Sequence, residues 1–173
     1  MSDVITTMSY GDDVSHAITL LVGNEKAIGE TVHIAGARAV TWDNVNQIYC
    51  NTLNVICGSS PDYVFIDDWK NVSRNLGKYY QIKYARSISR RFDNSKLEAL
   101  IGTFRFVDPD TGLKECLMQF LEGERRFRNV SWKAEAYFNK VTKDRLKDKN
   151  LSKKDRVKYL IGRYTPYFHL KSK

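Results

Sequence analysis

Residues 11–48, GDDVSHAITLLVGNEKAIGETVHIAGARAVTWDNVNQI, decide the expected fold because helical, extended and turn signals follow one another at short spacing. Apolar residues recur at helical spacing behind the carboxylates of Asp12 and Asp13, which are good helix N-caps. Thr31–Ala35 is typical of a short strand, and Thr41 is a suitable N-cap for the next helix. The stretch therefore predicts a helix, a strand and a second helix in succession.

Similar signals continue along the chain. Tyr63–Ile66 predicts a second strand, whereas residues 78–91 show no sustained period and residues 104–107 suit a strand or an extended arm. Further helices are predicted at 67–76, at 96–101, at 109–121, after Ser131 and after Ser152. The expected fold class is α/β, or α+β by strict count: a small, mostly helical lobe with a few short strands, a helical C-terminal extension and no complete Rossmann domain.

Charge divides the chain unevenly. Residues 1–120 hold 12 Lys/Arg and 14 Asp/Glu, whereas residues 121–173 hold 16 Lys/Arg and 6 Asp/Glu, so the net charge of +8 belongs to the last third. We expect a lobe over residues 1–122 and a basic helical extension over residues 123–173. Such an extension is either an electrostatic appendage or the solvated surface of ordinary helices.

Several protein classes are excluded by composition. No run of about 18 apolar residues predicts a membrane span, and the first residues lack the basic and apolar pattern of a secretory signal. The three cysteines form no CxxC pair, and the three histidines lack metal-ligand spacing. We therefore expect no disulfide framework and no metal site, and a reducing cytoplasm as the location.

Five segments resemble one family in the same order along the chain. They are Tyr10–Asp13, Gly29–Ile34, Thr41-Trp42, the FDNSKL segment Phe92–Leu97, and the helix from Gly112 to Phe120-Leu121. Together they resemble the carboxy-terminal lobe of the NAD-dependent epimerases and dehydratases of nucleotide sugars, which are extended short-chain dehydrogenases. The resemblance covers roughly residues 3–122.

The resemblance implies a bacterial-type isomerase or dehydratase that uses NAD(P) when complete. This chain has ten scattered glycines and no G-x-G-x-x-G turn, so we expect the chain alone to bind no cofactor and to be inactive. It would be a truncated product, a domain, or half of a split enzyme. Tyr79 and Lys83 have the family's catalytic Tyr–Lys spacing, but they follow the third predicted helix, and we assign no catalytic residue.

The resemblance also implies where a substrate diphosphate would bind. Arginine suits phosphates because its planar fork donates two hydrogen bonds at once, and residues 78–91 contain no acid. The diphosphate candidates are Arg86, Arg90 and Arg91, with Tyr84 and Ser87 as hydrogen-bond donors and Arg38 as a weaker candidate. The alternative is a solvated basic loop. Met8 and Tyr10 suit either a pocket lining or core packing.

The expected partners follow from this interpretation. They are a nucleotide-sugar substrate and either a second copy or a chain with the Rossmann half; no membrane is expected. Aromatic residues alternate with cations after Arg125, but no nucleic-acid recognition signature is present, so nucleic acid is not expected. The alternative function is a stand-alone interaction module that binds a partner protein or a polyanion through its basic C-terminal helices.

Overall fold

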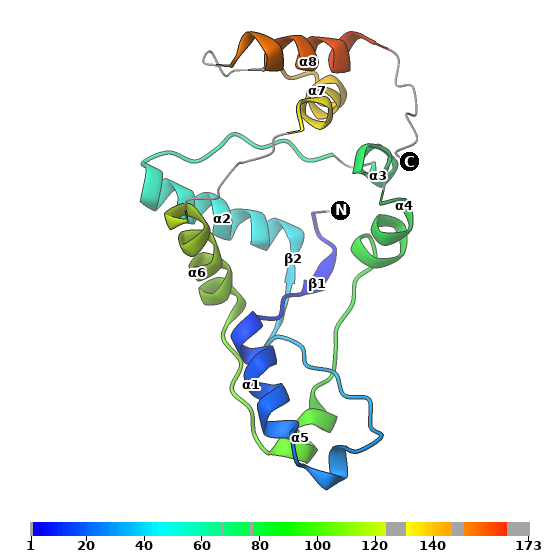
Figure 1. Cartoon of the computed structure of the whole chain (residues 1–173), viewed down its shortest axis with the longest axis vertical. Coiled ribbons are helices and arrows are strands. Elements are labelled where there is room, and N and C mark those ends of the chain that lie inside the picture. The colour runs from blue at the N-terminus through cyan, green and yellow to red at the C-terminus, as the bar shows by residue number, and fades with distance from the viewer. Residues whose placement is uncertain (1, 67, 77, 124–130, 147–150, 166–173) are drawn as a thin grey trace. The chain divides into compact units, whose positions relative to one another are not determined.

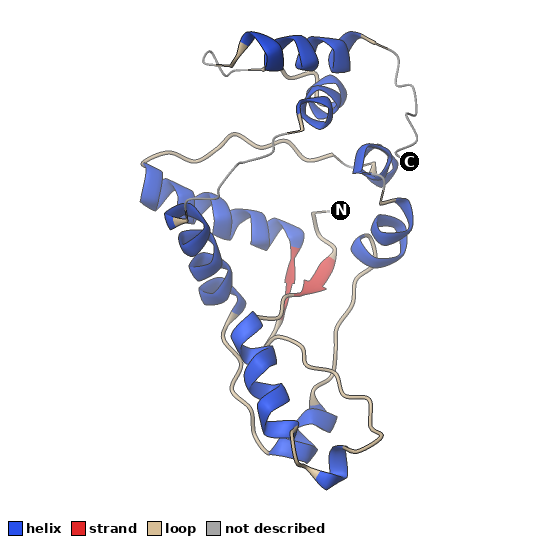
Figure 2. Cartoon of the chain, viewed as in Figure 1, coloured by secondary structure: helices blue, strands red, loops and turns tan. Residues whose placement is uncertain are grey.

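The fold is mostly helical, with one small sheet (Figure 2). The structure is a computed structural model, and it describes residues 2–66, 68–76, 78–123, 131–146 and 151–165. The expected class, a small helical fold with a few short strands, is confirmed. No helix of the described residues is both long enough and apolar enough to cross a membrane.

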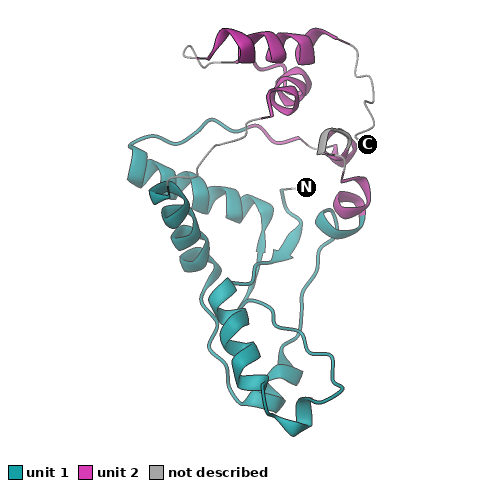
Figure 3. Ribbon diagram, in the orientation of Figure 1, with its two compact units in different colours: residues 1–63, 84–126 teal, residues 64–83, 127–173 magenta. Residues whose placement is uncertain are grey.

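The chain forms two compact units (Figure 3). Unit 1 consists of Met1–Tyr63 and Tyr84–Arg126, and unit 2 of Val64–Lys83 and Phe127–Lys173. This division differs from the expected one in two respects. Unit 1 ends at Arg126 and not at residue 122. Residues 64–83 group with the basic extension and interrupt unit 1 in the sequence.

Unit 1 is built around two short antiparallel strands (Figure 1). β1 (Ile5–Thr7) pairs with β2 (Ala39–Thr41), with Ile5 opposite Thr41. Helix α1 (Gly11–Leu21) packs against α5 (Ser95–Ile101), and α2 (Trp42–Cys57) packs against α6 (Pro109–Glu122). A 3-10 turn, η1 (Glu25–Ala27), follows α1. The buried cluster of this unit consists of Ala17, Leu97 and Phe104, with Leu21, Val32, Ile34, Ile101 and Phe106 around it.

Both strands expected from the sequence are wrong. Residues 31–35 and 63–66 belong to no ladder, and the described residues pair only as β1 and β2. At Ala35 a side chain takes the place of a partner strand: the Ala35 N–H donates to Asn94 Oδ1 at 3.0 Å, and Asn94 Nδ2 donates to the Ala35 carbonyl at 2.8 Å. Tyr63–Phe65 expose about half of their side-chain surface, which a buried strand would not do.

The capping residues predicted most of the helix starts correctly. The Thr41 side chain accepts from the Asn44 N–H, and Asn44 Oδ1 accepts from the Thr41 N–H, which completes a capping box at α2. Asp108 caps α6 with Pro109 in its first turn. In unit 2, Ser131 caps α7 (Trp132–Val141) and Ser152 caps α8 (Lys153–Tyr164).

The start of α1 is different. Its N-cap is Tyr10, with no side-chain cap bond, so the expected capping role of Asp12 and Asp13 is wrong. Asp13 is only 8% exposed, and its Oδ2 accepts a hydrogen bond from the Val107 N–H at 2.9 Å. Residues 104–107 form an extended arm that belongs to no strand. The Asp13 carboxylate therefore holds this arm against α1.

The regular secondary structure of unit 2, among its described residues, is entirely helical. α3 (Trp69–Leu76) is followed by a single turn, α4 (Tyr79–Gln81), and by a π-helical turn, η2 (Ile82–Arg86), whose last residues belong to unit 1. The sequence showed no period here, yet Ile82 is buried. α7 and α8 pack closely, because a Cβ added at Gly162 would lie 3.1 Å from Ala136 Cβ.

Candidate functional site

The predicted diphosphate site lies on a segment that is fastened along the open edge of β1. We call residues 84–91 the arginine segment. The Ile5 N–H donates to Ser89 Oγ at 3.1 Å, and the Arg90 N–H donates to the Ile5 carbonyl at 3.1 Å. Trp42 Nε1 donates to the Arg86 carbonyl at 3.1 Å. The backbone of the segment therefore has a defined path beside the sheet, while the side chains of Arg86, Arg90 and Arg91 are exposed.

The side chains of the arginine segment differ in their surroundings. Arg86 is exposed, and its guanidinium carbon lies 5.5 Å from the centre of the Trp42 ring, a cation–π contact. Arg90 Nη2 donates to the Ala85 carbonyl at 2.5 Å. Arg91 and Tyr84 are exposed, and Ser87 is half-buried. Five of the six predicted binding residues thus lie on this one anchored segment, where they are already neighbours in the sequence.

Arg38, the sixth predicted residue, is engaged elsewhere. Its Nε donates to Asp108 Oδ2 at 2.9 Å, and its Nη2 donates to Asp108 Oδ1 at 3.2 Å and to Asp110 Oδ1 at 2.6 Å. The hydrogen bond from Arg38 holds the pKa of Asp108 below its ordinary value, and the weaker effect of the Asp110 N–H lowers it further. Two carboxylates around one guanidinium leave a negative cluster, which repels a diphosphate.

Met8 and Tyr10 line a small cavity beside α6. The cavity holds about 50 Å³ and is also lined by Pro109, Gly112 and Cys116. The Tyr10 hydroxyl donates to Glu115 Oε2 at 3.0 Å, and this bond, together with burial, raises the pKa of Tyr10. A water occupies about 30 Å³ of liquid, so this cavity suits one or two waters and is too small for a nucleotide sugar.

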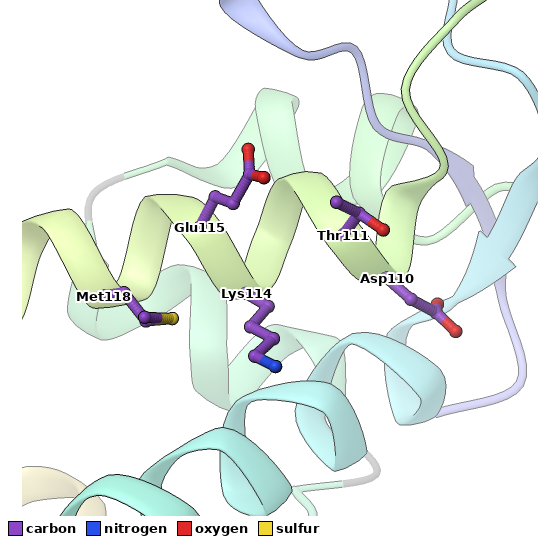
Figure 4. A pocket seen from close by; sticks show the side chains of 5 residues that line it. All are labelled: Asp110, Thr111, Lys114, Glu115 and Met118. Carbon is purple, nitrogen blue, oxygen red and sulfur yellow. The ribbon is translucent and has the colours of Figure 1, made fainter.

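A larger hollow, of about 420 Å³, lies along α6 (Figure 4). Its lining residues all come from successive turns of this helix: Asp110, Thr111, Lys114, Glu115 and Met118. The two carboxylates are already engaged, Asp110 by Arg38 and Glu115 by Tyr10. The sequence analysis did not single out this surface, and its mixed charges define no acid–base pair.

The sequence analysis assigned no catalytic role to Tyr79 and Lys83, although they have the family's Tyr–Lys spacing. The structure places the Lys83 ammonium against aromatic rings. Here Lys83 Nζ lies 5.6 Å from the centre of the Tyr79 ring and 6.0 Å from the centre of the Trp69 ring, as in cation–π contacts.

The described residues do not fit the NAD(P) that the resemblance implies. A dinucleotide pyrophosphate needs closely spaced glycines between a strand and a helix N-terminus. β1 leads into α1 with Gly11 as the single glycine of the connection, and Asp12 and Asp13 occupy the first turn. These carboxylates oppose an anion at that helix start.

The part of the chain that the structure describes contains no group of side chains that could bind a metal ion. No three His, Cys, Asp or Glu residues there are grouped as ligands, and Cys50, Cys57 and Cys116 are free thiols.

Comparison with known proteins gives no relative to set beside this geometry. The chain matches no family model, no curated protein and no solved structure.

Proposed function

We propose that unit 1 is the substrate-binding lobe of a nucleotide-sugar epimerase or dehydratase and that it holds the substrate diphosphate on the arginine segment. The observation that carries this proposal is the anchoring of the segment. Two hydrogen bonds to the Ile5 backbone, one of them made by the Ser89 hydroxyl, and one from the Trp42 indole hold the chain that bears Arg86, Arg90 and Arg91. An anchored arginine loses less conformational freedom when it binds an anion.

Each residue has a defined part in this proposal. Arg86 rests its guanidinium over the Trp42 ring, which orients the fork for a bidentate bond to one phosphate. The exposed Arg91 supplies charge for the second phosphate, and Arg90 stiffens the segment through the Ala85 carbonyl. Tyr84 and Ser87 add hydroxyl groups beside Arg86.

Catalysis belongs to the complete enzyme under this proposal. The residues of this chain bind and orient the substrate, and a Rossmann domain with NAD(P), from another part of the protein or a partner chain, carries out the redox chemistry. A reducing cytoplasm suits such an enzyme, and it suits three free thiols.

Calorimetric titration of the full chain with uridine diphosphate tests the proposal. Arg86→Ala should weaken binding by about 2–3 kcal/mol, because a charge-assisted hydrogen bond is lost. The double variant Arg90→Ala/Arg91→Ala should also weaken it. Arg105→Ala removes an equal charge from an exposed arginine of unit 1 outside the segment and serves as the control. Unchanged affinity in both test variants, or no binding to the natural chain, would overturn the proposal.

A further inference from the structure

Unit 2 contains a hollow whose lining is basic and aromatic. It has a volume of about 400 Å³, within the range of about 300–1,000 Å³ that is usual for small-molecule sites. Residues 145 and 146, which follow α7, and one face of α8 form its wall. The lining residues are Arg145, Leu146, Arg156, Tyr159, Leu160, Arg163 and Tyr164.

Three arginines line this hollow, and no acidic residue is among its lining residues. Arg156 and Arg163 are two turns apart on α8 and so share a face, and Arg145 follows α7. Among the residues that the structure describes, none of the three has a carboxylate within ion-pair distance. This contrasts with Arg38 of unit 1, whose guanidinium is matched by two carboxylates.

A buried tyrosine orients one of these arginines. Tyr159 is 4% exposed, and its hydroxyl oxygen accepts hydrogen bonds from Arg163 Nη1 at 2.9 Å and from Asn139 Nδ2 at 3.1 Å. A guanidinium has five N–H donors, so this bond orients Arg163 and leaves most of its donors for a ligand.

Two of the lining residues, Leu160 and Tyr164, expose apolar side-chain surface. The Tyr164 side chain is 75% exposed and that of Leu160 is 45% exposed. A ligand therefore meets cationic donors in one part of the hollow and an aromatic and an aliphatic surface in another.

We propose that this hollow binds a nucleoside phosphate, with the phosphate on Arg145, Arg156 and Arg163 and the base against Tyr164 and Leu160. Three guanidinium groups carry three positive charges, more than the single negative charge of a carboxylate can balance. A terminal phosphate carries a charge of about −1.5 to −2 and three strong acceptor oxygens, and it suits them better. The site is separate from the arginine segment and goes beyond the proposed function. A free nucleotide and a single strand of nucleic acid share this chemistry.

The test is calorimetric titration of the full chain with adenosine diphosphate and with a thymidine octamer. All proteins in the test carry Arg86→Ala, Arg90→Ala and Arg91→Ala, so that the result does not depend on the arginine segment. Arg156→Gln/Arg163→Gln should weaken binding at least tenfold. Lys153→Gln/Lys154→Gln removes the same charge from α8 outside the hollow and should change binding less than twofold.

Arg145→Ala is a further test, because this exposed loop residue bears no described side-chain contact on which folding depends. It should weaken binding severalfold with unchanged helix content by circular dichroism. Equal losses in the arginine and lysine double variants, or no binding of either probe to the background protein, would overturn the proposal. If the octamer binds more tightly than adenosine diphosphate and its affinity falls steeply as the salt concentration rises, the ligand is a nucleic acid strand. If the two probes bind with equal affinity, the ligand is the free nucleotide.

Discussion

The contacts inside unit 1 and those inside unit 2 differ in how far apart their residues lie in the sequence. In unit 1, the Asp13 side chain bonds to Val107, which is 94 positions away in the sequence. The Asn94 side chain bonds to Ala35, which is 59 positions away. In unit 2, the main contact joins α7 and α8, which are neighbours in the sequence. Local contacts close with a smaller loss of chain entropy. Changes at single long-range contacts should therefore damage unit 1 more than comparable changes damage unit 2.

The units also use arginine differently. Arg38 of unit 1 is matched by Asp108 and Asp110, and Lys96 of the same unit pairs with Glu30. The arginines of the hollow in unit 2 meet no such partner among the described residues. The difference concerns these arginines and not every cation, because Lys158 of unit 2 pairs with Asp155. Arg38 is held by carboxylates of its own unit, whereas the arginines of the hollow have no such ion pair among the described residues.

The largest effect is expected at Gly36 in unit 1. A Cβ at this position would lie 1.9 Å from the Met8 carbonyl oxygen, a clash with backbone that no rotamer relieves. Gly36→Ala should lower the free energy of unfolding by about 3 kcal/mol or more, at the upper end of overpacking effects. Urea unfolding measures this change. Gly11→Ala is the control, because its Cβ meets nothing within 4 Å and should cost little.

Asp13→Ala should have the next largest effect. It removes the acceptor of the Val107 N–H and leaves that partly buried donor unpaired, at a cost of about 2 kcal/mol. Asp12→Ala, at the exposed neighbouring carboxylate, should change stability by less than half of that. Hydrogen exchange should show faster exchange in α1 and unchanged exchange in α7 and α8. Equal exchange changes in both units would contradict the contrast drawn above.

Gly162→Ala tests the local contact of unit 2. The added Cβ would meet Ala136 Cβ at 3.1 Å and Lys133 Cα at 3.3 Å, so the two helices must move apart slightly. We expect a cost of about 1–2 kcal/mol, smaller than at Gly36 because the neighbours at Gly162 must shift by only a few tenths of an ångström, whereas the clash at Gly36 is far more severe. Thermal unfolding followed by circular dichroism measures it. A cost larger than that of Gly36→Ala would reverse the expected order.

The smallest effect concerns the ion pairs of Arg38. Its hydrogen bonds keep the pKa of Asp108 below the ordinary value, so this carboxylate stabilises the fold above its unfolded pKa. The contribution is lost as the pH falls through the lowered folded pKa. Arg38→Met should raise the pKa of Asp108 in an NMR titration and cost less than about 1 kcal/mol at neutral pH, since the pair is half exposed. An unmoved pKa would show that Arg38 does not hold this carboxylate in solution.

The helices could be predicted because their signals are local. Thr41, Asp108, Ser131 and Ser152 each begin a helix with a cap that needs no distant residue. The strands could not, because β1 and β2 have three residues each, too few to show an alternating pattern. Residues 31–35 have strand composition, but Asn94 supplies the bonds that a partner strand would have made.

The proposed binding residues could be predicted only in part. Arg86, Arg90 and Arg91 could be found because they cluster in the sequence, whereas their fastening to Ile5 and Trp42 depends on the fold. The engagement of Arg38 with Asp108, 70 residues away, had no local signal. The hollow of unit 2 left a partial signal: Arg156 and Arg163 lie seven residues apart on a predicted helix.

The contact between Trp42 and Arg86 gives unit 1 an optical reporter. The indole N–H is fixed on the Arg86 carbonyl, and the guanidinium lies over the ring. The other two tryptophans, Trp69 and Trp132, belong to unit 2. In a chain with phenylalanine at these two positions, all indole emission comes from Trp42. An anion that draws the Arg86 charge away from the ring alters the field on the excited indole, so its emission wavelength reports occupancy of this one segment.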